Sequence, residues 1–86
     1  MTEKITGLLD EVQDEVFALQ FKEADKKLLL LLEGLEPWAS ELRPDKLPEF
    51  NKIMLEVSAA RQKADYLLLA DLLEYKLRLF AEKAAT

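Results

Sequence analysis

The amino-acid sequence predicts an all-α protein, a four-helix bundle built from two helical hairpins. Half of its 86 residues are hydrophobic and only two are glycine, a composition typical of compact helical domains. One apolar pattern with helical spacing also occurs twice, 45 residues apart, which indicates a repeated helical unit. The matching positions are Ile5 and Phe50, Leu8 and Ile53, Leu9 and Met54, Val12 and Val57, Phe21 and Tyr66, Leu28 and Leu73, Leu32 and Leu77, and Leu35 and Phe80.

The first repeat contains two apolar stripes that are out of phase with each other. Thr2 or Thr6 can cap the first helix. Nine residues separate Val12 from Phe21, where the second stripe begins. Nine residues are about 2.5 turns of an α-helix, so one straight helix would place the two stripes on opposite sides. We therefore expect the chain to break near residues 20–22.

The second repeat shows the same phase step, between Val57 and Tyr66. Asp65 is a favourable N-cap residue immediately before Tyr66, so a second break is expected near residues 62–65. An alternative interpretation has one long helix in each repeat, with a second apolar face for a partner. In that arrangement the chain is an antiparallel hairpin of two helices that dimerises. The absence of Gly and Pro at both junctions favours this alternative.

Prolines separate the two repeats. Pro44 and Pro48 flank a polar link, and proline removes an amide donor and restricts the residue before it, so no helix is expected to pass through. The expected boundaries, within one domain of residues 1–86, are a first hairpin at about 3–42, the link at 44–48 and a second hairpin at about 49–83. The predicted core consists of Ile5, Leu9, Val12, Val16, Leu28, Leu32, Phe50, Ile53, Val57, Leu69, Leu73 and Leu77.

The net charge of −5 is unevenly distributed. Residues 1–43 carry five basic and ten acidic side chains, whereas residues 44–86 carry seven of each. An acidic surface repels phosphate groups and anionic lipids, so neither a nucleic acid nor a membrane is expected as a partner. The N-terminus lacks the apolar segment of a secretory signal, and the longest apolar run, residues 28–32, is far shorter than a membrane span of roughly 20 residues. A cytoplasmic location is expected.

The residue types present exclude most metal and catalytic sites. The sequence contains no histidine and no cysteine, which are the usual ligands of zinc, copper, haem and iron–sulfur clusters. Ser40 and Ser58 have no histidine to activate them as nucleophiles. We therefore expect no enzyme, no metal site and no cofactor. An alternative function is weak binding of a cation or a small basic ligand by i,i+4 carboxylate pairs on one helix. These carboxylates are Asp10, Glu11, Asp14 and Glu15.

Two short segments are apolar around the whole circumference of a helix, residues 28–32, which are all leucine, and residues 66–70. Such a helix must be buried on several sides. Either both segments form the centre of a monomeric bundle, or a homodimer shares them, as in obligate dimers whose interface resembles a protein core. Trp38 either covers the end of the bundle or anchors an interface. The candidate interface residues are Leu29, Leu30, Trp38, Leu67, Leu68 and Tyr75.

Residues 65–75 have the sequence Asp-Tyr-Leu-Leu-Leu-Ala-Asp-Leu-Leu-Glu-Tyr. This segment resembles one near the C-terminus of small, uncharacterised helical proteins of Gram-positive bacteria. Residues 21–24, Phe-Lys-Glu-Ala, are similar to the same family at the start of the second helix. The resemblance implies a cytoplasmic bacterial protein of unknown function, and it brings no catalytic residues to this chain.

Together these features predict a non-enzymatic protein–protein interaction module that forms a homodimer. Its mechanism would be helix-in-groove contact through leucine side chains that the core does not use. The alternative partner is a client helix, because small acidic helical proteins also serve as export or assembly chaperones. That alternative is an analogy of size and charge.

Overall fold

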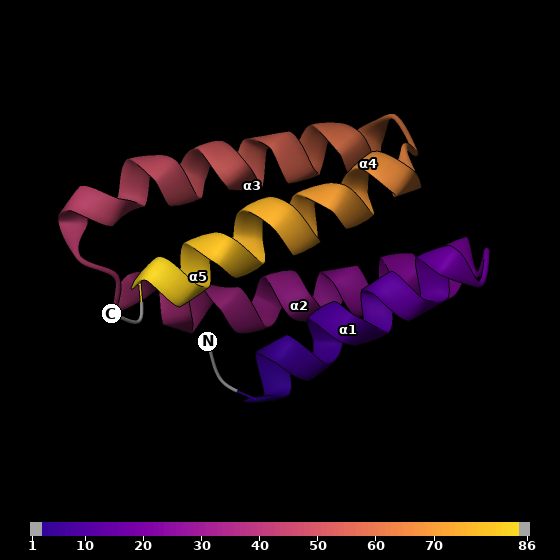
Figure 1. The fold of residues 1–86 in the computed structure, drawn as a ribbon, viewed down its shortest axis with the longest axis horizontal. Coiled ribbons are helices and arrows are strands. Elements are labelled where there is room, and N and C mark those ends of the chain that lie inside the picture. The colour runs from indigo at the N-terminus through magenta and orange to yellow at the C-terminus, as the bar shows by residue number, and fades with distance from the viewer. Residues whose placement is uncertain (1–2, 85–86) are drawn as a thin grey trace.

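The computed structural model describes residues 3–84 and shows four helices that pack against one another (Figure 1). The predicted all-α fold of two hairpins is confirmed, and the alternative of two long helices is wrong. The last helix has three parts, because a π-helical turn separates two α-helical segments. In chain order the elements are α1 (Glu3–Phe17), α2 (Phe21–Ser40), the 3-10 turn η1 (Pro44–Lys46), α3 (Leu47–Gln62), α4 (Tyr66–Asp71), the π-helical turn η2 (Leu72–Leu77) and α5 (Arg78–Ala84).

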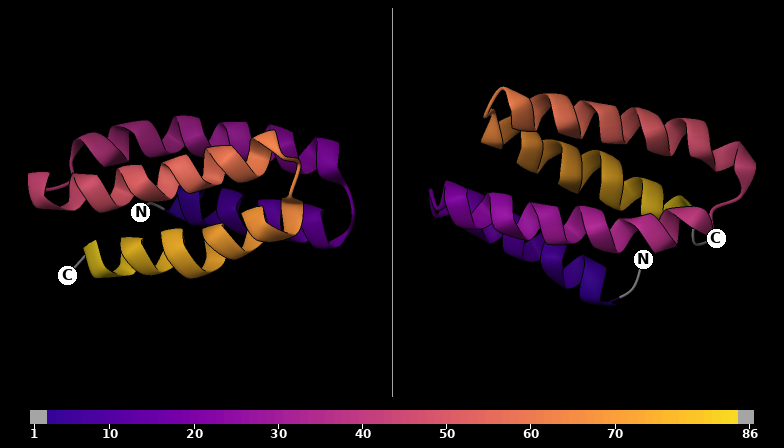
Figure 2. Two further views of the ribbon diagram at one scale, coloured as in Figure 1. Left: turned by 90° about the horizontal axis from the view of Figure 1, so that it is seen from above. Right: turned by 180° about the vertical axis from the view of Figure 1, so that it is seen from behind.

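The helices alternate in direction, and each hairpin forms one layer of the bundle (Figure 1). Both hairpin turns lie at one end, and the link between the hairpins lies at the other end (Figure 2). Helix α1 packs beside the last helix, while an ion pair joins α2 to α3. An approximate two-fold rotation about the long axis of the bundle therefore relates the hairpins, as the sequence repeat predicts.

Both hairpin turns have the same backbone design. Leu19 and Ala64, which are equivalent in the repeat, adopt left-handed conformations with φ of 61° and 54°. In each turn the next amide N–H donates to the carbonyl five residues earlier, at 2.8 Å after Leu19 and 2.9 Å after Ala64. This is the Schellman arrangement that ends helices, formed here without the glycine that usually takes the left-handed position. The expected breaks near residues 20–22 and 62–65 are confirmed.

The residues that begin the second helix of each hairpin differ in capping. Asp65 accepts a hydrogen bond from the Leu68 amide at 3.1 Å, which confirms its predicted role as an N-cap. Gln20, at the equivalent position, makes no such side-chain bond. Just beyond these caps, the rings of Phe21 and Tyr66 stack with their centroids 4.5 Å apart. Because these two residues are equivalent in the repeat, their contact lies close to the two-fold axis.

Several helix boundaries differ from the prediction. The cap candidate Thr2 lies outside the described residues, and the candidate Thr6 lies inside α1. The link covers residues 41–46 instead of 44–48, because α2 ends at Ser40 and Pro48 belongs to the first turn of α3, where a missing N–H needs no helical partner. Pro37 lies in the last turn of α2, where its missing N–H removes only one helical hydrogen bond.

The core lies between the hairpins, and eleven of the twelve residues predicted for it are buried. The prediction is wrong for Leu32, which is half-buried, whereas its neighbour Leu31 is fully buried. Spacings of three and four residues keep side chains on one side of a regular α-helix, and Leu31 has these spacings from Leu28 and Leu35. The further buried apolar residues are Ala24, Leu31, Leu35, Ala60, Ala70, Leu72, Phe80 and Ala81.

The π-helical turn η2 changes the register of the last helix relative to α2. Buried residues follow one another here at intervals of four, at Leu69, Leu73, Leu77 and Ala81. In a continuous α-helix such positions would drift by about 40° at each step. A π-helical turn takes up extra backbone and returns the later positions to the core side. Consequently Lys76, the repeat equivalent of Leu31, is exposed and donates to Glu56 of α3 at 2.7 Å.

Candidate interaction surfaces

The predicted interface residues lie at separate places on the bundle. Five of the six are exposed, from 43 % for Leu29 to 67 % for Leu67 and Tyr75. Leu67 and Leu68 lie in the first turn of α4, at the hairpin-turn end. Leu30 lies over the contact between α1 and α2. Leu67 and Leu68 are thus the candidates that lie at the hairpin-turn end.

Trp38, the sixth candidate, covers the opposite end of the core. Its ring packs edge-on against Phe50 and Phe80, with centroid distances of 5.8 and 6.2 Å. Such edge-to-face contacts favour aromatic packing beyond the area that they bury. Trp38 is only half-buried, so part of its ring remains at the surface and lines a groove. The interpretation of Trp38 as a cover for the bundle end is the one that its contacts support.

Exposed apolar side chains gather at the hairpin-turn end of the bundle. Leu67 and Leu68 are joined there by Phe17 at the end of α1, Leu19 in the turn and Phe21 at the start of α2. We call these five residues the turn-end patch; their exposed fractions range from 38 % to 72 %. The aromatic stacking near the two-fold axis brings the starts of α2 and α4 together. Exposed apolar residues grouped at one end of a protein mark an interaction site more often than scattered single residues do.

Three residues of the patch, Phe17, Leu19 and Phe21, were not predicted as interface residues. The turn between α1 and α2 leaves them at the surface. Phe21 begins the second apolar stripe of the sequence, but the turn leaves it at the surface, stacked on Tyr66. Phe17 follows the buried Val16 directly, and adjacent residues of a helix do not share a face. A phenylalanine outside the core spacing is the sequence signal that could have identified this surface.

Each hairpin also carries a groove over the contact between its two helices. The α1/α2 groove has a volume of about 620 Å³, and the α3/α5 groove has one of about 260 Å³. The two grooves are related by the repeat. Five pairs of equivalent positions line them: Lys4 and Glu49, Leu8 and Ile53, Leu30 and Tyr75, Gly34 and Leu79, and Trp38 and Lys83.

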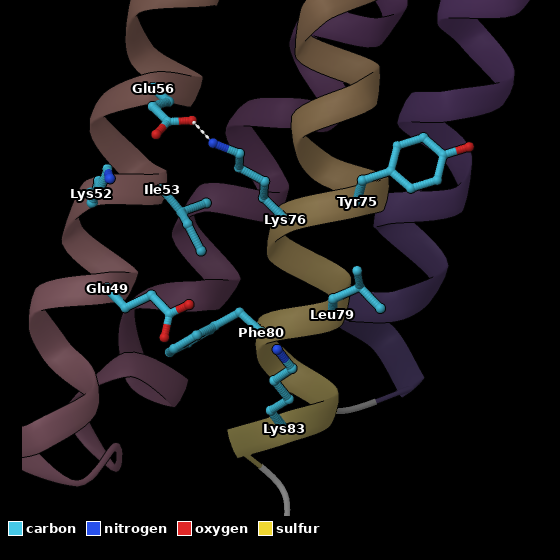
Figure 3. Close-up of a pocket in the computed structure, with 9 residues that line it drawn as sticks. All are labelled: Glu49, Lys52, Ile53, Glu56, Tyr75, Lys76, Leu79, Phe80 and Lys83. Atoms are coloured by element: carbon cyan, nitrogen blue, oxygen red, sulfur yellow. Dashed lines mark hydrogen bonds and ion pairs between the residues drawn. The ribbon is translucent and has the colours of Figure 1, made fainter.

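Side chains at two equivalent positions explain why the α1/α2 groove is larger. A Cβ atom at Gly34 would collide with Cδ1 of Ile5, so glycine permits the close approach of α1 to α2. In the other hairpin the equivalent residue is Leu79, whose side chain lines the smaller groove. Figure 3 shows Leu79 beside the α3/α5 groove, with Lys83 one turn further along the helix. Trp38 gives the larger groove an aromatic wall where Lys83 gives the smaller one a charged wall.

Two of the carboxylates considered as cation ligands are paired with cations of the chain itself. Asp10 forms an ion pair with Arg78 of α5, and Glu11 forms one with Lys27 of α2 at 3.4 Å. Burial lowers the pKa of Arg78, but its hydrogen bond to Asp10 and the nearby charge of Glu74 raise it by more, so the net shift is upward. Within residues 3–84, no group of three or more acidic residues is arranged to hold a metal ion.

A further ion pair joins the two hairpins. Arg61 of α3 donates two hydrogen bonds to Asp25 of α2, at 2.7 and 3.1 Å. This bidentate geometry is the strongest form of an arginine–carboxylate pair. The hydrogen bond from Arg61 lowers the pKa of the Asp25 carboxyl, and the positive charge of Arg61 adds to that shift. The pair therefore contributes to the contact between α2 and α3 when Asp25 is ionised.

Comparison of the chain with protein-family models, curated proteins and solved structures finds no match. Within residues 3–84, none of the helices combines the length and the apolar character that a membrane span requires. A functional proposal for this chain therefore depends on its own surfaces.

Proposed function

We propose that this protein is a non-enzymatic interaction module that self-associates through the turn-end patch. The observation that carries the proposal is the gathering of five exposed apolar side chains at one end of the bundle. Removing apolar surface from water is favourable by about 25 cal/mol for each Å². A second copy of the chain offers the same apolar surface, so contact between two patches removes both from water.

The residues around the patch are compatible with a symmetric contact. Lys22 and Lys63 are exposed beside it, and so are Glu23 and Asp65. In a two-fold dimer each patch faces its own copy, so a rim with both signs of charge can place opposite charges across the interface. A chain of 86 residues has a small core, and self-association is one of the usual ways in which small domains gain stability.

The test is the solution mass measured by light scattering over a concentration series. We expect the mass to rise from that of one chain toward that of two. Leu67→Glu places a charge in the patch, at a side chain that is 67 % exposed and therefore not needed for folding. This variant is expected to remain monomeric at concentrations where the unmodified protein dimerises, because the interface would contain a buried, unpaired carboxylate.

The matched control is Leu55→Glu in α3. Leu55 is 72 % exposed and lies outside the patch, so the same change of residue should leave the mass unchanged. Circular dichroism of both variants checks that helicity is kept. A monomer at all concentrations, or an equal loss of assembly in the two variants, would contradict the proposal.

A further inference from the structure

We propose that the α1/α2 groove binds an amphipathic helix of a partner protein that carries lysine or arginine beside its apolar face. The groove lies over the first hairpin and shares no residue with the turn-end patch. The proposal is therefore independent of self-association. It assigns a second protein partner, of defined chemistry, to a different surface.

The shape of the groove fits a helix. Leu30, Gly34 and Trp38 follow one another at intervals of four along α2, and Leu8 faces them from α1. The eleven-residue step from Leu30 to Glu41 corresponds to about 16 Å, or roughly three turns. An apolar stripe with i, i+3 and i+4 spacing can lie along a groove of this length. Gly34 lets Ile5 pack directly against the α2 backbone, so no side chain projects from α2 at this position of the groove.

The charges around the groove select a basic partner. Glu33 of α2 and Glu41, the C-cap residue of that helix, are exposed at the groove, and within residues 3–84 neither forms an ion pair. Lys4 is the basic residue among those that line the groove. Residues 1–43 also carry ten acidic and only five basic side chains. This field attracts cationic segments and repels fatty acids, anionic lipids and nucleic acids.

The second hairpin shows that the bundle does not need such a groove. At equivalent positions it has Tyr75, Leu79 and Lys83, and its groove has less than half the volume. Lys52, Lys76 and Lys83 against Glu49 and Glu56 also give the smaller groove a different charge balance. The same hairpin architecture therefore forms with larger side chains at these positions. The combination of Gly34, Trp38 and acidic walls is particular to the first hairpin.

A second copy of the chain is a less suitable occupant. Its lysine-bearing surface is the α3/α5 groove, which the two-fold relation places on the opposite side of the bundle from the α1/α2 groove. Docking one onto the other would leave a free groove on each copy, so the contact would continue head-to-tail rather than close into a dimer. We therefore assign the groove to a different protein.

The experiment uses Trp38 as its reporter, because it is the only tryptophan in the chain and lines the groove. The probe is a short capped peptide of leucine, lysine and alanine, with leucine at helical spacing. The comparison peptide has glutamate at every lysine position. We expect a saturable shift of the Trp38 emission with the leucine–lysine peptide. Affinity for the leucine–glutamate peptide should be at least about tenfold lower, as expected for opposed against like charges.

Two double variants separate local charge from net charge. Glu33→Lys with Glu41→Lys should lower the affinity for the lysine peptide about tenfold and raise that for the glutamate peptide. Asp71→Lys with Glu82→Lys changes the net charge equally, at exposed residues of the second hairpin. This control should keep the preference of the unmodified protein. Leu30→Ser, at a half-exposed residue, tests the apolar wall and should reduce binding of the lysine peptide while helicity is kept.

Four results would overturn the proposal. Equal affinity for the two peptides would show that the groove does not select a basic partner. No response of Trp38 to either peptide would show that the groove takes no helix. An equal effect of the two double variants would show that only net charge matters. A shift of Trp38 emission with protein concentration alone, reversed by peptide, would assign the groove to a second copy.

Discussion

The two hairpins have the same backbone plan, yet their second helices bury leucines in different ways. In α2 the buried residues Leu28, Leu31 and Leu35 follow the spacing of a regular α-helix. In residues 66–84 one row of buried leucines, Leu69, Leu73 and Leu77, follows intervals of four, and η2 corrects the drift. This difference in burial, together with a few substitutions between the repeats, makes the exposed surfaces of the two hairpins different. The groove of one hairpin has Gly34 where the smaller groove of the other has Leu79. A repeat can thus keep its core while its outer faces diverge.

The largest expected effect tests whether the two cores are equivalent. Leu28 and Leu73 are repeat partners, and both are fully buried. Replacing either with alanine should lower the free energy of unfolding by about 2–5 kcal/mol, because a cavity remains where the side chain was removed. Urea denaturation of each variant measures the loss. Leu29→Ala, at an exposed neighbour, should change stability by no more than about 0.5 kcal/mol.

The informative quantity is the difference between the decreases in unfolding free energy caused by Leu28→Ala and by Leu73→Ala. Equal losses would mean that the regular and the π-containing helices pack equally well. A difference larger than about 1.5 kcal/mol would show that the two helices pack their equivalent leucines unequally. A variant of Leu28 or Leu73 as stable as the unmodified protein would contradict the assignment of these residues to the core.

A smaller effect concerns the caps that begin the second helices. Asp65→Ala removes the hydrogen bond to the Leu68 amide and should lower the free energy of unfolding by about 1 kcal/mol. Gln20 makes no capping bond at the equivalent position, so Gln20→Asp should raise the free energy of unfolding by about 0.5–1 kcal/mol. Thermal or urea denaturation checks both changes. A loss of stability in Asp65→Ala together with a gain in Gln20→Asp supports the equivalence of the two turns. Changes of stability in the same direction would contradict it.

The smallest effect concerns the Arg61–Asp25 pair between the hairpins. Because the folded-state pKa of Asp25 is below its usual value, the ionised carboxylate stabilises the folded protein. This contribution is complete above the unfolded-state pKa of about 3.9 and is lost as pH falls through the lower folded-state pKa. Asp25→Asn should lower the free energy of unfolding by about 0.5 kcal/mol at neutral pH, as for other partly exposed pairs.

The measurement for this pair is the urea midpoint of both proteins as a function of pH. The difference in urea midpoint between the two proteins should disappear as the pH falls below the folded-state pKa of Asp25. A difference that is constant across the whole pH range would show that the asparagine acts through packing and not through charge. High salt at neutral pH should reduce the difference, because salt screens an exposed pair.

Several features of the fold were predictable because they depend on local periodicity. The phase step from Val12 to Phe21 requires a break, and the break occurs at Leu19. The capping role of Asp65 also follows from residue type and position. The site was predictable only in part. Leu67 and Leu68 were identified from an all-apolar segment, whereas Phe17 joins them only because the chain folds back at the turn.

The sequence by itself determined the helical class, the repeat of the apolar pattern and the absence of histidine and cysteine, and it favoured divided helices over two long ones. These follow from composition and from the spacing of apolar residues along one helix, which is short-range information. Tertiary structure alone decided which of the leucines at 28–32 face the core, where η2 turns the last helix, and that Trp38 lies between a closed core and an open groove. Each of these depends on how closely helices distant in sequence approach one another. In an all-apolar segment any side of the helix can face the core, so packing against the neighbouring helices determines which side is buried.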